Sequence, residues 1–99
     1  MKWLINTPKT EPKPGTLIAF INKKGKLSAG YISQEVLYYD YYDGASDVPV
    51  YGIVCHSNNG TAISIDNIFA YCEIKIPKYI LEQIKPTPNS PIGQYLKEN

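Results

Sequence analysis

Apolar side chains recur at every second position through much of the chain, which is the spacing of half-buried β-strands. In the run from Ile68 to Ile76, the even-numbered residues are all apolar and Glu73 and Lys75 fall on the other face. The run from Leu17 to Asn22 differs, because both of its alternating sets are apolar. That composition predicts a strand covered on both faces.

Three further β-rich runs complete the predicted sheet: Leu27 to Ser33, Val48 to Cys55 and Thr61 to Ile65. Lys23-Lys24-Gly25 separates the first two runs of the chain, and we expect Gly25 to take the left-handed conformation of a three-residue hairpin loop. The run that begins at Leu27 could extend through Val36 to Tyr42, ahead of a turn at Asp43-Gly44. Gly30 lies inside this run and indicates a bulge or a close backbone approach.

The two ends of the chain have a different pattern. Residues 6–16 hold three prolines and predict an irregular lead-in. Tyr79, Ile80 and Ile84 have helical spacing and predict one short helix over Lys78 to Lys85. Residues 86–99 contain three more prolines and are expected to form a flexible or loosely docked tail, so that residues 1–85 make up a single β-rich domain.

Together these elements predict a mainly β protein. At 99 residues the chain has room for one hydrophobic core. It has no internal repeat, and five or six short strands joined by tight turns favour a small bent sheet or an open SH3-like barrel with one short C-terminal helix.

Charge and cysteine usage restrict the function. The formal net charge is +1, and no arginine is present. This disfavours binding to long nucleic acids, because phosphate recognition relies on a positive field and on the guanidinium fork. No run of residues is apolar enough to span a bilayer or to act as a secretory signal, and two cysteines are too few for a disulfide scaffold. We therefore expect a cytoplasmic protein with reduced thiols and no membrane partner.

Several short motifs resemble a known family. They are Trp3-Leu4-Ile5 ahead of a proline-rich segment, a hairpin ending in Gly30-Tyr31-Ile32, and Ile68-Phe69-Ala70-Tyr71 before Ile76-Pro77. This pattern resembles a family of short uncharacterised phage and prophage proteins, a domain of unknown function that opens with Trp-Ile and closes with an aromatic residue followed by Leu-Pro. The chain departs from the family in lacking a second tryptophan near its end. The resemblance implies a phage or mobile-element origin, with the host cytoplasm as its location, and supplies no site residues.

Residues with catalytic or metal-binding chemistry are present, but their spacing does not form a site. Cys55 and His56 are neighbours in a predicted strand, so their side chains should point to opposite faces. With Cys72 they lack the paired spacing of a zinc site. Asp40, Asp43 and Asp47 do not match a calcium loop and are expected to form a solvated acidic segment. We predict no enzyme activity, no cofactor and no metal.

The most distinctive segment is rich in tyrosine and acids, and it is the main candidate binding site. Its members are Tyr38, Tyr39, Asp40, Tyr41, Tyr42 and Asp43. In a strand, one face would carry Tyr38, Asp40 and Tyr42 and the other Tyr39, Tyr41 and Asp43, so that at least two tyrosines would be exposed together. The alternative is that one set fills the core and the other caps a sheet edge.

The favoured function is a non-enzymatic binding protein that contacts a host protein or sequesters a small-molecule ligand, with interference with bacterial defence as one setting. Self-association through edge strands would give a homo-oligomer. The alternative is a small barrel that binds nucleic acid or nucleotides, with Lys23, Lys24 and Lys26 as the anion-binding residues and Phe20 and Tyr31 as stacking surfaces.

Overall fold

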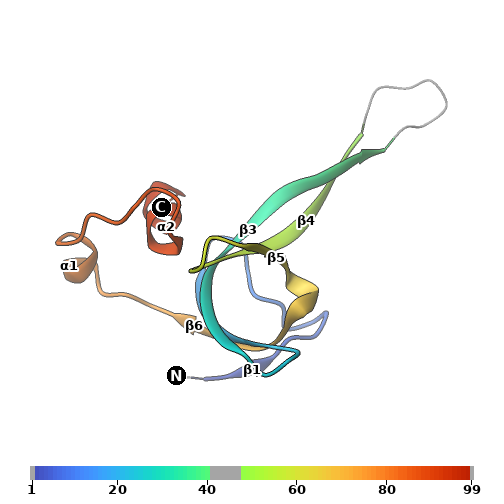
Figure 1. Cartoon of the computed structure of the whole chain (residues 1–99), viewed down its shortest axis with the longest axis horizontal. Helices are drawn as coiled ribbons and strands as arrows, with labels where there is room; N and C mark the ends of the chain where they lie inside the picture. The colour runs from blue at the N-terminus through green and yellow to red at the C-terminus, as the bar shows by residue number, and fades with distance from the viewer. Residues whose placement is uncertain (1, 41–47, 99) are drawn as a thin grey trace.

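The computed structural model describes residues 2–40 and 48–98, which form one antiparallel sheet with the strand order β1-β6-β2-β3-β4-β5 (Figure 1). The strands are β1 Leu4–Ile5, β2 Leu17–Asn22, β3 Leu27–Asp40, β4 Val48–Ser57, β5 Ala62–Ser64 and β6 Ile68–Ile74. The sheet curls, but its end strands β1 and β5 do not pair, so it stays open. The prediction of a mainly β protein with a small bent sheet is confirmed.

The core lies on the concave face of the sheet. It is built from Ile18 and Phe20 of β2, Ile32 of β3 and Cys55 of β4, with Tyr71 of β6 beside them. A short 3-10 turn, η1 Ile65–Asn67, leads from β5 into β6 and closes one side of the core. We call the sheet face that carries these side chains the core face, and the opposite face the outer face.

β2 is covered on both faces, as its apolar composition predicted. Ile18 and Phe20 point into the core, whereas Leu17 is 5% exposed on the outer face. The strand lies between β3 and β6, so neither of its edges is free. A central strand loses most of its solvent contact, which is why an apolar residue is favourable at nearly every position.

The two glycine predictions for the first hairpin are confirmed. Gly25 has φ of +83°, the left-handed conformation that a residue with a Cβ rarely adopts. Gly30 allows β4 to approach β3 closely, because a Cβ at this position would lie 2.5 Å from the Sγ of Cys55 and 2.8 Å from the carbonyl oxygen of His56. Of the two alternatives for Gly30, close approach is therefore the correct one.

β6 is more buried than its alternation predicted. Ala70 and Cys72 are buried on the outer face, whereas a bulge between Ile68 and Ala70 places Ile68 on the core face together with Tyr71, which is only 6% exposed. The prediction that Ile68 shares a face with Ala70 and Cys72 is therefore wrong. Tyr71 is buried because β1 pairs with β6 and the proline-rich lead-in folds over it, so that the hydroxyl of Tyr71 donates to the carbonyl oxygen of Thr10 at 2.7 Å. The short strand β1 was not expected from the sequence.

The helical segments differ from the prediction over Lys78 to Lys85. The helix α1 covers only Lys78–Leu81, and the next helix, α2, covers Pro91–Glu98. None of the α1 residues is buried. Because most helical stability in proteins comes from tertiary packing, a single unpacked turn is not stabilised enough to continue to Lys85. The hydroxyl of Ser90 accepts from the amide of Gly93 at 3.0 Å, and Pro91 occupies the first turn, both of which favour a helix start.

α2 lies against the outer face of β2 and β3 (Figure 1). The ring of Tyr95 meets the ring of Tyr31 edge to face, with 6.5 Å between their centroids. Glu98 accepts a hydrogen bond from the Tyr31 hydroxyl at 3.2 Å. The C-terminal segment therefore contains a helix docked on the sheet, whereas the sequence predicted a flexible or loosely docked tail.

Candidate functional site

β3 and β4 continue as a two-stranded arm beyond the body of the protein. The pairing of β2 with β3 ends at Leu17↔Tyr31, and the pairing of β5 with β4 ends at Val54↔Ser64. Past these points β3 and β4 pair only with each other. We call residues 34–40 and 48–53 the arm, which projects away from the rest of the sheet in Figure 1.

The arm exposes apolar side chains on both faces. A β-bulge at Leu37 adds one residue to β3 between Val36 and Tyr38, so that Tyr38 falls on the face opposite Val36. The exposed core-face residues are Val36, Tyr39 and Tyr51, and the exposed outer-face residues are Leu37, Tyr38 and Val48. An isolated two-stranded ribbon is marginally stable in water, and these six side chains find little cover within the arm.

The arm includes the first half of the segment singled out from the sequence. Tyr38 and Tyr39 are 54% and 58% exposed, and they lie on opposite faces as the alternation predicted. Asp40 shares the outer face with Tyr38. Tyr41, Tyr42 and Asp43 lie outside the described residues. For the described tyrosines, the alternative of core packing is wrong.

Sequence reasoning predicted the partner strand β4 but missed its contribution to the exposed surface of the arm. Tyr51 is 58% exposed beside Val36, and Val48 is paired with Asp40, yet β4 was expected only as an ordinary strand. The available signal was the turn predicted at Asp43-Gly44, because two β-rich runs on either side of a turn signal are expected to pair with each other. An apolar residue opposite an exposed tyrosine becomes part of the same surface.

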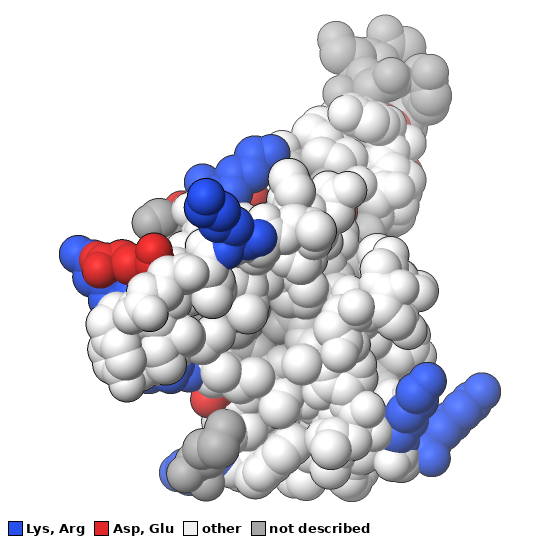
Figure 2. Space-filling view, turned by 60° about the vertical axis from the view of Figure 1, so that its left-hand side comes forward, with Lys and Arg blue, Asp and Glu red and all other residues white. Residues whose placement is uncertain are grey.

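Charge is distributed unevenly with respect to the arm. All ten lysines precede residue 27 or follow residue 74, so that β3, β4 and β5 contain no basic side chain except His56. The described part of the arm carries the acids Glu35 and Asp40. Figure 2 shows lysines in separate groups on the body, whereas the described part of the arm carries none on this face. The arm is therefore an apolar and acidic surface.

His56 meets a carboxylate at the base of the arm. Its Nε2 pairs with the Oε2 of Glu35 on the outer face, and both side chains are partly exposed. Cys55 points the other way into the core, as predicted, and burial raises the pKa of its thiol to about 12. A thiol with that pKa is protonated at neutral pH, so Cys55 and His56 do not form a nucleophile and its base.

The three lysines of the alternative site lie together in the β2–β3 turn. The side chain of Asn22 accepts from the amides of Lys24 and Lys26, each at 2.9 Å, which organises the turn and leaves Lys23, Lys24 and Lys26 exposed. The rings expected to stack on bases are not available. Phe20 is 3% exposed and Tyr31 is 1% exposed, so that part of the prediction is wrong.

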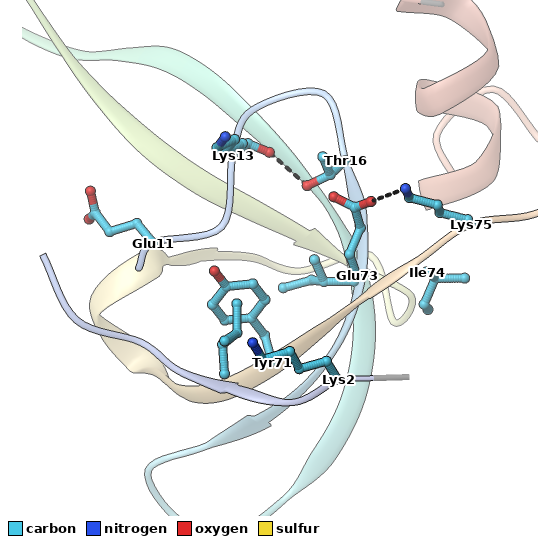
Figure 3. A pocket seen from close by; sticks show the side chains of 10 residues that line it. Lys2, Glu11, Lys13, Thr16, Tyr71, Glu73, Ile74 and Lys75 are labelled. Atoms are coloured by element: carbon cyan, nitrogen blue, oxygen red, sulfur yellow. Dashed lines mark hydrogen bonds and ion pairs between the residues drawn. The ribbon is translucent and has the colours of Figure 1, made fainter. Parts of the chain in front are cut away.

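Two hollows on the body bear on small-ligand binding. The larger, about 700 Å³, lies at the open end of the curled sheet over Leu4, Ile18 and Tyr71. Figure 3 shows its charged lining, Lys2, Glu11, Lys13, Glu73 and Lys75, with an ion pair of 3.8 Å between Glu73 and Lys75. Because acids and bases lie close together here, the hollow has no strong preference for a charged ligand.

The smaller hollow, about 230 Å³, lies between the outer face of the sheet and the start of α2. Its walls include Leu17, Ile74, Ile76 and Ile92 and are almost wholly apolar. Asn58 and Ser90 border this hollow, but almost none of its surface is polar, whereas small-molecule sites typically have a few polar groups that orient the ligand.

Within residues 2–40 and 48–98, no cluster of three or more histidine, cysteine or acidic side chains is arranged to hold a metal ion. None of the described helices has the length and apolar character needed to cross a membrane. In comparisons with known proteins, no family model, curated protein or solved structure matches the chain. The resemblance to the phage family therefore stays a prediction.

Proposed function

We propose that this chain is a non-enzymatic binding protein that contacts a partner protein through the arm. The observation that carries the proposal is the exposure of apolar side chains on both faces of a ribbon that the rest of the protein does not cover. Tyrosine gives a large contact area at low entropic cost, and Tyr38, Tyr39 and Tyr51 are the most exposed rings there. Exposed apolar surface on this scale marks an interaction site.

Protein binding is favoured over the other candidates by the same surface. The larger hollow has mixed charge. The two rings predicted to stack on bases beside the lysine turn, Phe20 and Tyr31, are buried. The partly exposed pair of Glu35 and His56 has no thiol beside it to activate. The arm, in contrast, offers contacts to a protein surface along its whole length.

The setting rests on the sequence resemblance. A phage or mobile-element origin, the host cytoplasm as location, and interference with a defence system are parts of this proposal. An SH3-like classification is supported by the chain order, since β2 to β5 form a meander, η1 follows, and β6 returns to pair with β2. Neither part changes which surface makes the contact.

Photo-crosslinking in the native cell tests the proposal. Tyr39 is replaced by p-benzoylphenylalanine, and the matched control carries the same group at Tyr79, which is 64% exposed on α1. We expect a discrete protein adduct from position 39 and none from position 79. Binding of that partner should weaken by about thirtyfold for each ring removed in Tyr39→Ala and Tyr51→Ala. Equal adducts from both positions, or full affinity in the folded double variant, would contradict the proposal.

A further inference from the structure

One proline shows which backbone N–H and C=O groups of β3 point away from β4, toward the edge of the arm that no strand covers. Pro49 of β4 pairs with Tyr39 of β3, and a proline inside a strand pair directs its nitrogen away from its partner. Tyr39 and Pro49 therefore form a pair without mutual hydrogen bonds, and Tyr39 directs its own N–H and C=O to the free edge of β3.

A second position in β3, Ile32, confirms this orientation. Ile32 pairs with Cys55, which lies an even number of residues along β4 from Pro49. By the alternation of antiparallel ladders, Ile32 should also point its backbone away from β4. Its N–H donates to the carbonyl oxygen of Thr16 at 2.9 Å, and its C=O accepts from the amide of Gly15 at 2.7 Å. Ile32 is thus the last outward residue of β3 that the body satisfies.

Beyond Ile32, the outward backbone groups of β3 belong to Gln34, Val36 and Tyr39. No other strand of the described chain pairs with this stretch. The β4 edge is protected, because Pro49 offers no donor there, but the β3 edge has neither a proline nor a lysine. Natural proteins prevent strand addition with proline, lysine and bulges, and the β3 edge has only the bulge at Leu37, so β3 is the less protected edge.

Building on the proposed function, we propose that this edge of β3 binds an extended segment of the partner protein as an added strand. Its apolar side chains would lie on the core face beside Val36 and Tyr39. Its basic side chains would lie on the outer face, near Glu35 and Asp40, with their aliphatic stems over Tyr38. The partner is thus a strand that alternates apolar and basic residues, recognised by main-chain hydrogen bonds and by charge.

A second copy of the chain fits this edge less well. Antiparallel pairing of β3 with itself would bring Glu35 and Asp40 of both copies into one ladder, and β3 has no lysine to compensate them. Like charges close together in a sheet are destabilising. The same two carboxylates attract a basic strand, although Glu35 also pairs with His56, so the charge of the arm selects a different protein.

The probe is a synthetic nonapeptide of alternating valine and lysine, with binding measured by calorimetry on the whole chain. Two control peptides carry either glutamate in place of lysine or N-methyl groups on alternate residues. We expect the lysine peptide to bind and the glutamate peptide to bind at least about tenfold more weakly. The N-methylated peptide should not add to β3 through the edge on which its backbone donors are blocked.

Variants of one cross-strand pair locate the peptide. Val36→Pro removes an outward donor from β3 without touching the β3–β4 ladder, and Val36→Ala removes the side chain alone. Tyr51→Pro is the matched control on the β4 edge, since Tyr51 pairs with Val36. We expect Val36→Pro to lose binding at least about tenfold and the other two variants to lose clearly less. Circular dichroism establishes that each variant is folded.

Three outcomes would overturn the inference: equal binding of the lysine and glutamate peptides, full affinity in folded Val36→Pro, or a dimer of the free chain in sedimentation. Its failure is distinguishable from failure of the proposed function. If the crosslinked partner is lost in Tyr39→Ala and Tyr51→Ala but retained in Val36→Pro, the arm binds through its faces and no strand is added. If it is retained in all three, the proposed function fails as well.

Discussion

Leu37 lies across Gly52, and its side chain occupies the space that a Cβ on Gly52 would need. The contact joins the bulge of β3 to the facing strand of the arm. Gly30 has an equally close contact at the other end of the same hairpin, but there the neighbours are Cys55 and the backbone of His56. The two glycines therefore make a matched pair with different expected costs.

Gly52→Ala should change stability by no more than about 1 kcal/mol. The new methyl group displaces Leu37, but that side chain is 56% exposed and can rotate into solvent. The loss of backbone entropy in the unfolded chain offsets part of the cost. Urea unfolding gives the free-energy change, and the methyl resonances of Leu37 report its movement. A large loss of stability with unmoved resonances would show that this contact has been misjudged.

Gly30→Ala should destabilise the fold by about 1–3 kcal/mol. The methyl group would lie 2.5 Å from the Sγ of Cys55, which is fully buried, and 2.8 Å from a carbonyl oxygen of the backbone. Neither neighbour can move into solvent. The same urea titration as for Gly52→Ala measures the difference, and equal midpoints for the two variants would contradict it.

Tyr31 should make stability fall at alkaline pH. Burial, with Glu98 adding to it, raises the pKa of the Tyr31 hydroxyl above its ordinary value of about 10. The unfolded chain then loses this proton first, so stability is fully present below about pH 10 and is lost as the pH rises through the folded-state pKa. Tyr31→Phe should flatten this loss.

Part of the alkaline loss should remain in Tyr31→Phe, because burial also raises the pKa of Tyr71. At neutral pH the variant loses only the hydrogen bond to Glu98, worth about 0.5–1.5 kcal/mol. Denaturant titrations between pH 7 and about pH 11 compare the two proteins. Parallel pH profiles would rule out Tyr31 as a contributor.

Cys55 should be unreactive in the folded protein. Its thiol is completely buried, and with a pKa of about 12 almost none of it is thiolate at neutral pH. Iodoacetamide followed by peptide mass spectrometry should find Cys55 unmodified in buffer and modified in concentrated guanidinium chloride. Modification in buffer at the rate of a free cysteine peptide would show that the core opens at β4.

Local pattern determined most of the strands and the faces of most of their residues. The sequence predicted β2 with its observed bounds, the left-handed Gly25, and the opposite faces of Tyr38 and Tyr39. Each depends on the intrinsic two-residue period of a strand or on the backbone freedom of one residue, so neighbouring positions contain the information.

Only the tertiary structure decided which parts of those strands are covered. The arm is free because β2 stops pairing at Tyr31 and β5 at Val54, and the open edge of β3 follows from the same limits. The pairing of His56 with Glu35 and of Tyr95 with Tyr31 likewise joins residues far apart in the chain. Such contacts depend on strand lengths, a bulge and a helix docking position, which no local periodicity encodes.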